Sequence, residues 1–246
     1  MTEKYSSFQA SCANCGLKGI CFPQGLQDAE MQLLNELVDR SPCAIKGELL
    51  YSAGDRVTAL YAIRAGIVKI YSYSEGGEEM IHGFYLPGDI IGMESMAFEC
   101  HQYNAVALDT TSVCGLPYHR LTELGIKIPN FNTQLFSLMS LEIVSSRKHA
   151  MLLTQKSAEQ RLAEFLWNMS QKFQSRGYEH LQFRLNVLHR EVANFLNLTP
   201  ETISRILGKF HQAQILTWKR KEVVIHQEAL LRACATGQET KACTGG

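Results

Sequence analysis

Four cysteines in this chain have the chemistry of a metal-ligand set. Cys12, Cys15 and Cys21 form a C-x2-C-x5-C run near the N-terminus, and Cys114 lies far along the chain. Thiolates bind zinc and iron–sulfur clusters, and both kinds of centre need four ligands. The short run offers three, so Cys114 completes the set only if folding returns it to the N-terminus. A set divided in this way would make a metal centre depend on tertiary structure, as a sensor requires.

Two other uses of these cysteines, a structural zinc site and a redox centre, have to be weighed against their spacing. A structural zinc site of four cysteines usually contains two close pairs, whereas Cys12 and Cys15 are the one close pair here. A C-x-x-C redox enzyme would carry its motif at a helix start within a βαβ pattern, which this sequence lacks. The sequence also shows no hydrolytic triad and no phosphate-cradling glycine loop, so we expect no enzyme. No role is assigned to the isolated cysteines Cys43, Cys100, Cys234 and Cys243.

The composition is that of a globular protein, with 46% hydrophobic and 20% charged residues. No apolar run reaches the roughly 18 residues that a membrane-spanning helix needs, so no membrane partner is expected. The N-terminus lacks the basic and apolar regions of a signal peptide. We therefore expect a cytoplasmic protein, in which structural disulfides are rare and clustered cysteines need another explanation.

The formal net charge of zero hides a division between the two halves of the chain. Residues 1–130 contain nine Lys and Arg against fifteen Asp and Glu, and residues 131–246 contain the reverse. The basic second half favours contact with a polyanion such as DNA through that half alone.

The order of the predicted elements gives an α+β protein. Residues 26–38 have the apolar spacing of a short amphipathic helix. From residue 45 to about 118 the segments are short, β-branched and aromatic, with turn dipeptides such as Ala53-Gly54 and Pro87-Gly88, which predicts an antiparallel barrel or roll. Its closing strand would carry Cys114.

A stretch without further Pro or Gly begins at Pro129 and runs to Phe173. Its apolar and small residues recur at spacings of three and four, which is typical of a two-stranded coiled coil. The alternative is a helix packed on its own roll. Ser157 and Gln160 resemble a capping box that begins a second helix. The candidate dimer residues are Phe136, Met139, Ile143, Ser146 and Ala150.

The region from residue 184 to residue 226 predicts a winged helix-turn-helix. A helix over LHREVANFLNL is followed by Thr199 as an N-cap, Pro200 at the first helical position, a second helix, and a basic strand pair. Arg205 has the planar fork for guanine, and Glu201 can accept a hydrogen bond from cytosine N4. Ser204 lies beside them and completes the expected base contacts. The expected phosphate contacts are Thr199, Lys209, Lys219, Arg220 and Lys221.

Together, these motifs resemble the CRP/FNR family of bacterial transcription regulators, and within it the oxygen-sensing FNR subgroup. The resemblance rests on the cysteine spacing, on LYAIRAGIVKIY and GFYLPGDIIG in the roll, and on ETISRILGKF in the second helix. It implies a homodimer in which Cys12, Cys15, Cys21 and Cys114 of each subunit hold one [4Fe-4S] cluster. It further implies binding to a TTGAT-N4-ATCAA palindrome without oxygen, release of DNA when oxygen converts the cluster, and contact with RNA polymerase.

The resemblance also sets the expected domain organisation. It consists of a cysteine-rich segment (1–25), a cyclic-nucleotide-binding-like β-roll (26–128), a dimerisation helix (129–156), a winged helix-turn-helix (157–230) and a disordered tail (231–246).

Two features separate this chain from other members of the family. A cyclic-nucleotide receptor needs an Arg-Ser pair and a Glu, but the matching positions here hold Tyr103, Asn104 and Met93, so we expect no cyclic nucleotide. Oxygen sensors of the family usually carry an acidic residue low in the dimer helix, where this chain has Ser146 followed by Arg147 and Lys148. Two alternatives follow: these basic residues supply the charge repulsion instead, or the cluster-free protein dimerises more readily.

Overall fold

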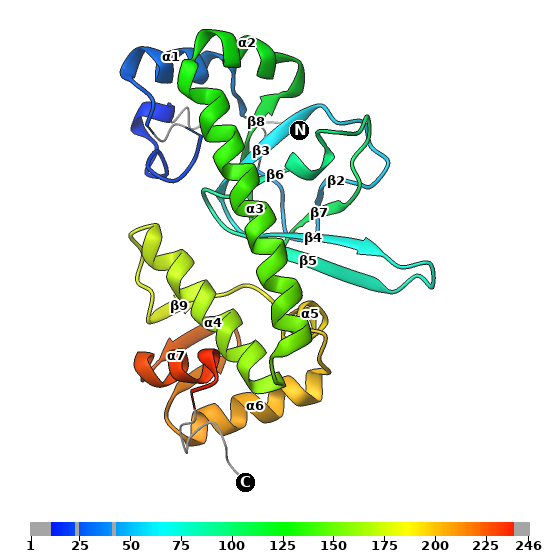
Figure 1. Ribbon diagram of the computed structural model, residues 1–246, viewed down its shortest axis with the longest axis vertical. Coiled ribbons are helices and arrows are strands. Elements are labelled where there is room, and N and C mark those ends of the chain that lie inside the picture. The colour runs from blue at the N-terminus through cyan, green and yellow to red at the C-terminus, as the bar shows by residue number, and fades with distance from the viewer. Residues whose placement is uncertain (1–10, 23–24, 41–42, 239–246) are drawn as a thin grey trace, which may run out of the picture. The chain divides into compact units, whose positions relative to one another are not determined.

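A computed structural model describes residues 11–22, 25–40 and 43–238 of the chain (Figure 1). The chain forms two compact units, the first ending at Ile143 and the second beginning at Val144. This boundary falls within the longest helix, α3 (Pro129–Gln155), where the sequence predicted a helix over residues 129–156. None of the described helices is long and apolar enough to cross a membrane.

The first unit contains the predicted roll, built from two four-stranded antiparallel sheets with strand orders β1-β8-β3-β6 and β2-β7-β4-β5. Apolar side chains from both sheets form one core cluster, which includes Ile63, Val68 and Val113. The strands are β1 (Asp39–Arg40), β2 (Leu49–Tyr51), β3 (Ala59–Ala65), β4 (Val68–Tyr73), β5 (Glu79–Tyr85), β6 (Ile90–Ile91), β7 (Asn104–Ala107) and β8 (Ser112–Pro117).

The turns of the roll occur at the glycines that the sequence indicated. Gly54 and Gly88 have φ angles of 91° and 94°, in the left-handed region that favours glycine. A Cβ atom on Gly88 would lie 2.7 Å from Ile20 Cδ1, so the turn also needs glycine for the close approach of the cysteine segment.

The first unit also contains short helices before, within and after the roll. The predicted amphipathic helix is α1 (Asp28–Leu37), which buries Met31 and Leu34. The 3-10 turn η1 (Cys12–Asn14) precedes it, and η2 (Met93–Ser95) and η3 (Tyr118–Arg120) lie within and after the roll. Helix α2 (Leu121–Lys127), which the sequence did not predict, leads into α3.

The second unit is the predicted winged helix-turn-helix with one additional strand. Its helices are α4 (Ala158–Ser175), α5 (His189–Phe195) and α6 (Pro200–Gln212), and its sheet has the order β10-β11-β9. Ser157 and Gln160 form the expected capping box, and the Thr199 side chain accepts from the Thr202 N–H as an N-cap. The strands are β9 (Gln182–Arg184), β10 (Leu216–Lys219) and β11 (Glu222–Ile225).

The prediction of a disordered tail from residue 231 was wrong for its first part. Helix α7 (Glu228–Thr236) buries Leu231, Cys234 and Ala235, and Gly237 ends it in a left-handed conformation with φ 75°. An amphipathic helix of nine residues is marginal alone, so its packing against α4 stabilises it. Residues 239–246 of the predicted tail lie outside the described residues.

Candidate metal centre and nucleic-acid interface

Strand pairing brings Cys114 to the N-terminal segment. The chain runs from the cysteine segment through α1 into β1, and β1 pairs with β8 so that Arg40 is opposite Cys114. On the other side of β8, Cys114 is opposite Ala62 of β3. The sequence expectation that a closing strand carries Cys114 is therefore confirmed.

Local turns and one helix hold the other three cysteines near this strand. The Cys12 backbone N–H donates to Asn35 Oδ1 of α1 at 3.0 Å, which ties the start of the segment to that helix. The Cys15 N–H donates to the Cys12 carbonyl, and the Cys21 N–H donates to the Leu17 carbonyl at 3.0 Å. These contacts fold the segment back on itself, so its cysteines need not lie along an extended chain.

The electrostatics of Cys21 show that the four thiols are neighbours. The pKa of the Cys21 thiol is raised to about 12, chiefly by burial, while a hydrogen bond from the Phe22 backbone N–H opposes the shift and the charges of Cys114, Cys15 and Cys12 add to it. The four carry thiols rather than disulfides. Deprotonating several of these thiols therefore requires a compensating positive centre between them.

This donor set fits a thiolate-ligated metal or iron–sulfur cluster, because it offers four soft ligands and one backbone N–H donor to sulfur. Within the described ranges, however, no three His, Cys, Asp or Glu side chains are already arranged to hold a metal ion. The fold thus supplies the neighbourhood, and the side chains must still converge on a common centre.

The shielding of the cysteine segment is uneven. Leu17 and Phe22 are 6% and 5% exposed, and Ile20 packs over the turn at Gly88. The small residues Ala13, Gly16 and Gly19 are exposed. The segment therefore buries one side and opens the other to small solutes.

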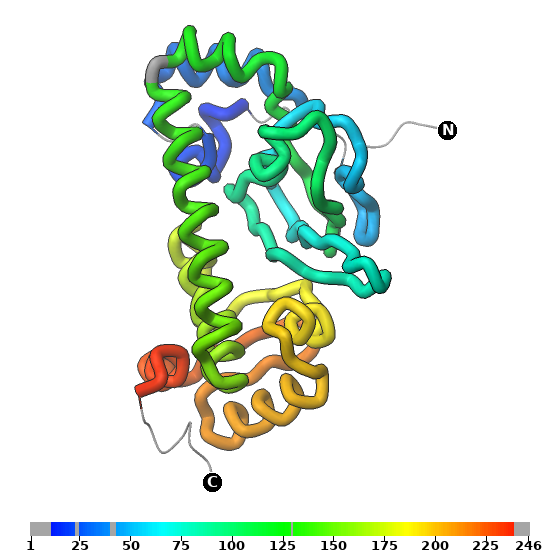
Figure 2. The backbone as a smooth tube through the Cα atoms, turned by 45° about the vertical axis from the view of Figure 1, so that its right-hand side comes forward, coloured from blue at the N-terminus to red at the C-terminus, as the bar shows by residue number. Residues whose placement is uncertain are grey.

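Phe22 connects the cysteine segment to the long helix. Its ring stacks on that of Phe131 in the first turn of α3, with the centroids 5.7 Å apart. The backbone of the cysteine segment, in dark blue, lies beside the first turns of α3, in green (Figure 2). Both rings belong to a core cluster that also contacts Cys21 and Cys114. A movement of the cysteines would therefore be felt directly by α3.

Helix α3 presents two kinds of face. Phe131 and Leu135 are buried against the roll, so the alternative of a helix packed on its own roll holds for this side. Of the candidate dimer residues, Phe136 and Ile143 are 64% and 52% exposed, Ser146 and Ala150 are exposed, and Met139 is half-buried against the roll's core. The sequence missed three more exposed apolar residues on this helix, which are Leu141, Val144 and Met151.

Helix α6 presents the predicted base-contact residues to solvent. Glu201, Ser204 and Arg205 are exposed, while its opposite side buries Ile203, Ile206, Leu207 and Phe210. In the described part of the chain, Glu201 and Arg205 do not form the intrahelical ion pair that their spacing allows. Their polar groups thus remain available for a ligand.

The wing carries a group of cations. Lys219, Arg220 and Lys221 are exposed at the turn between β10 and β11, and Arg220 has a φ of 56°. A left-handed conformation costs a non-glycine residue roughly 1–2 kcal/mol. With Glu222 and Arg184 of β9, these residues line a hollow of about 450 Å³. Sequence reasoning missed Arg184, because the strand that carries it pairs with β11 only in the folded domain.

Lys209 differs from the other expected phosphate contacts. Its ammonium group donates to Glu159 Oε1 at 2.6 Å, and both side chains are partly buried. The pair joins α6 to α4, so Lys209 has a structural partner in addition to any DNA contact.

Polar side chains of the roll have partners within the first unit, including the buried Lys69, which pairs with Glu79 at 2.8 Å. Asn104 uses its amide on the backbone, accepting from the Ala53 N–H and donating to the Tyr71 carbonyl. Tyr51 donates to Glu94, whose pKa is raised by burial, and Tyr85 donates to Glu142 of α3 at 2.8 Å.

Both units of the chain match domain families of known proteins. A cyclic nucleotide-binding domain model matches residues 45–126, and a Crp-like helix-turn-helix domain model matches residues 160–234. The chain is 41% identical to the transcriptional activator protein Anr of Pseudomonas protegens over 229 residues, covering 93% of this chain and 94% of that protein. It is 38% identical to the fumarate and nitrate reduction regulatory protein of Vibrio cholerae, covering 94% and 92%.

Among solved structures, FixK2 from Bradyrhizobium japonicum is similar with a TM-score of 0.73 and 26% identity, over 80% of this chain and 96% of that one. The two matched domains, their order along the chain and the identity to these relatives over nearly the whole length all agree. The chain belongs to the CRP/FNR family of transcription regulators.

Proposed function

We propose that this protein is an oxygen-responsive, DNA-binding transcription regulator of the cytoplasm. In this proposal Cys12, Cys15, Cys21 and Cys114 hold a [4Fe-4S] cluster, and the cluster-loaded protein is a homodimer that binds a TTGAT-N4-ATCAA-like palindrome. The observation that carries it is that Cys21 and Cys114, which come from two distant parts of the sequence, pack against one core cluster. The charges of Cys114, Cys15 and Cys12 also act on Cys21.

When bound, the cluster supplies oxygen-sensitive redox chemistry. The residues of this chain bind and shield it: the thiols hold it, Leu17 and Phe22 cover one side, and the exposed small residues of the segment leave a path for oxygen. Loss of ligands would release the Cys21 neighbourhood and, through the Phe22–Phe131 stack, the start of α3.

The exposed apolar side of α3 supports the homodimer. Phe136 and Ile143, which are seven residues apart and therefore on the same side of the helix, are 64% and 52% exposed. Apolar surface of this kind on one helix marks an interaction site, and a second copy of the same helix matches it in a coiled coil.

For DNA, Glu201, Ser204 and Arg205 would read base edges in each half-site, while Thr199, Lys209, Lys219, Arg220 and Lys221 would contact phosphates. Arg184 joins this group because it lines the same hollow as the wing cations. We include no cyclic nucleotide in the proposal, since the positions of the phosphate-binding pair hold Tyr103 and Asn104.

RNA polymerase is the proposed protein partner. The β4–β5 hairpin exposes Tyr73 and Met80, which are 58% and 50% exposed, beside the acidic residues Glu75 and Glu78. An apolar and acidic tip of this kind suits a basic protein surface.

The test is purification without oxygen, followed by a visible spectrum and a gel shift on the palindrome before and after exposure to air. We expect a brown protein that binds the palindrome, and both colour and binding should disappear in air. A colourless protein that contains zinc and binds DNA equally in air would replace this proposal with the structural zinc site.

A further inference from the structure

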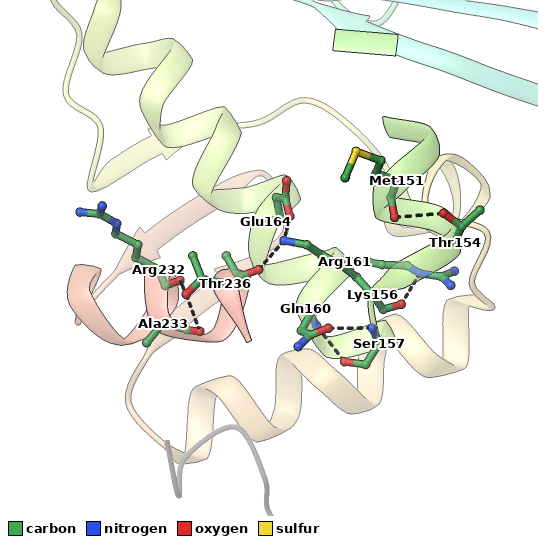
Figure 3. A network of polar contacts seen from close by, with 11 residues as sticks. Met151, Thr154, Lys156, Ser157, Gln160, Arg161, Glu164, Arg232, Ala233 and Thr236 are labelled. Atoms are coloured by element: carbon green, nitrogen blue, oxygen red, sulfur yellow. Dashed lines mark hydrogen bonds and ion pairs between the residues drawn. The ribbon is translucent and has the colours of Figure 1, made fainter. Parts of the chain in front are cut away.

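The C-terminal end of α3 is held by the guanidinium group of Arg161 in α4. Arg161 Nη2 donates to the Leu153 carbonyl at 2.6 Å. Its Nε donates to the Lys156 carbonyl at 2.9 Å (Figure 3). The last carbonyls of a helix lack partners within it, so these two bonds satisfy groups that would otherwise need water.

The same guanidinium group reaches the turn of the helix-turn-helix. Nη1 donates to the Leu196 carbonyl at 3.2 Å and to the Asn197 carbonyl at 3.5 Å. Leu196 is the C-cap of α5, and Asn197 has a φ of 52°. Thr199, the N-cap of α6, follows two residues later. A single planar group therefore contacts both the end of α3 and the turn from which α6 begins.

The partial negative charges around the guanidinium group of Arg161 favour a cation at this position. The four acceptors of Arg161 are carbonyl oxygens from the C-terminal ends of two helices, where the helix dipoles place partial negative charge. Lys156 repeats the arrangement at a third helix end: it donates to the Ala235 carbonyl of α7 at 2.7 Å and pairs with Glu164 (Figure 3).

We propose that Arg161 is a positioning residue that fixes the orientation of α6 relative to the end of α3, and thereby the half-site spacing that a dimer accepts on DNA. This inference rests on the proposed function, because it takes α3 as the dimer helix and α6 as the reading helix. Besides Arg161, the stack of His149 on Phe195 of α5, with ring centroids 4.1 Å apart, and the Lys156–Ser157 backbone join α3 to this domain, and Ser157 is extended with ψ 163°. Arg161 is the group that contacts both the last carbonyls of α3 and the turn before α6, so its loss gives α6 more freedom to turn about this corner.

A planar guanidinium group directs its N–H groups in several fixed directions, whereas an ammonium group is a compact charge on a flexible stem. Arg161→Lys therefore keeps the charge at the helix ends and removes the bridge. Arg161→Met removes both. Arg176 is the matched control, because it donates to the Lys172 carbonyl at 2.7 Å near the end of α4 and is the same residue type in the same domain.

The experiment measures anaerobic binding of the cluster-loaded full chain to palindromes whose half-sites are separated by three, four or five base pairs. Each base pair rotates one half-site by about 34–36° relative to the other, so a rigid dimer discriminates strongly among these spacers. We expect wild type and Arg176→Met to prefer one spacer by at least about tenfold, and Arg161→Lys to reduce this preference to about threefold or less.

Thermal unfolding and sedimentation of each variant separate this role from a general loss of stability. If Arg161→Met does not fold, Arg161→Lys decides the question. Equal weakening on all three spacers, or an unchanged preference in Arg161→Lys, would overturn the inference while leaving the proposed function intact. A wild type that binds none of the palindromes would instead contradict the proposed function, and this inference with it.

Discussion

The cysteine segment and the winged helix-turn-helix differ in how completely the chain itself determines their structure. Turns, one contact with α1 and a few buried apolar side chains hold the cysteine segment. The winged domain has capped helices, a fully buried side of α6 and a three-stranded sheet. Under the proposed function, this difference means that a bound cluster completes the first region, whereas the second is formed before DNA arrives.

The largest expected effect is on the region that needs its ligand. Cys21→Ser removes one of four thiols, so the visible absorption of the anaerobic protein should disappear and affinity for the palindrome should fall to the non-specific level, by about 10³-fold or more. Cys100→Ser is the control, because Cys100 lies outside the ligand set and should keep both properties. An unchanged spectrum in Cys21→Ser would remove this residue from the ligand set.

Hydrogen exchange compares the two regions within one molecule. Removing the cluster should accelerate amide exchange in residues 12–22 by about 100-fold, as expected for a segment that loses a ligand held at 100 times its dissociation constant. Amides of α6, such as Ile203 and Phe210, should keep their rates, since their hydrogen bonds lie within the helix and its buried side. Equal acceleration in both regions would contradict the independence of the winged domain.

Within the winged domain, substitutions of base-contacting residues and of phosphate-contacting residues should affect DNA binding in different ways. Arg205→Ala should weaken binding by about 10- to 100-fold and relax selectivity at one base pair of each half-site, because one bidentate contact discriminates by about 1–3 kcal/mol. Lys221→Ala should weaken binding to all sequences alike and reduce the salt slope by about 0.9 per subunit. Binding assays over a series of salt concentrations and single-base variants measure both effects.

A leucine on the exposed side of α3 should make dimerisation less dependent on the cysteine segment and its proposed cluster. Ser146→Leu adds apolar surface to the proposed seam, so the cluster-free protein should dimerise about tenfold more tightly, because the two leucines of a dimer, each about half-buried, together supply about 1.5 kcal/mol. Ser145→Leu is the matched control, since Ser145 is also exposed but lies outside the seam. Sedimentation of both variants in air provides the measurement, and equal effects would count against the seam.

The smallest expected effect concerns the cap of α6. Thr199→Ala removes the acceptor for the Thr202 N–H, which lies 3.2 Å away, and should lower the free energy of unfolding by about 1 kcal/mol. Thr154→Ala removes a hydroxyl that donates to the Ala150 carbonyl within α3 and should cost less. Denaturant unfolding of the two variants gives the comparison, and a cap effect near zero would mean that tertiary packing alone positions the start of α6.

Patterns with short range were the ones that could be predicted. The glycine turns, the Ser157 capping box, the Thr199 N-cap and the alternating strands all depend on neighbours within a few residues, and the structure contains each of them. Helix α7 was missed because its stability comes from α4, which lies more than fifty residues earlier in the chain. Arg184 was missed for the same reason, because its strand, β9, forms by pairing with β11, which lies far along the chain.

The sequence by itself determined the residue types and spacings: three thiols in one short run, a cap and a proline at the start of α6, and cations in the wing. Only the tertiary structure decided which of them meet. Pairing of β1 with β8 brings Cys114 beside the cysteine segment, and the fork of Arg161 joins α3 to the turn before α6. Both depend on contacts between distant residues, which burial and strand register select and which no local pattern encodes.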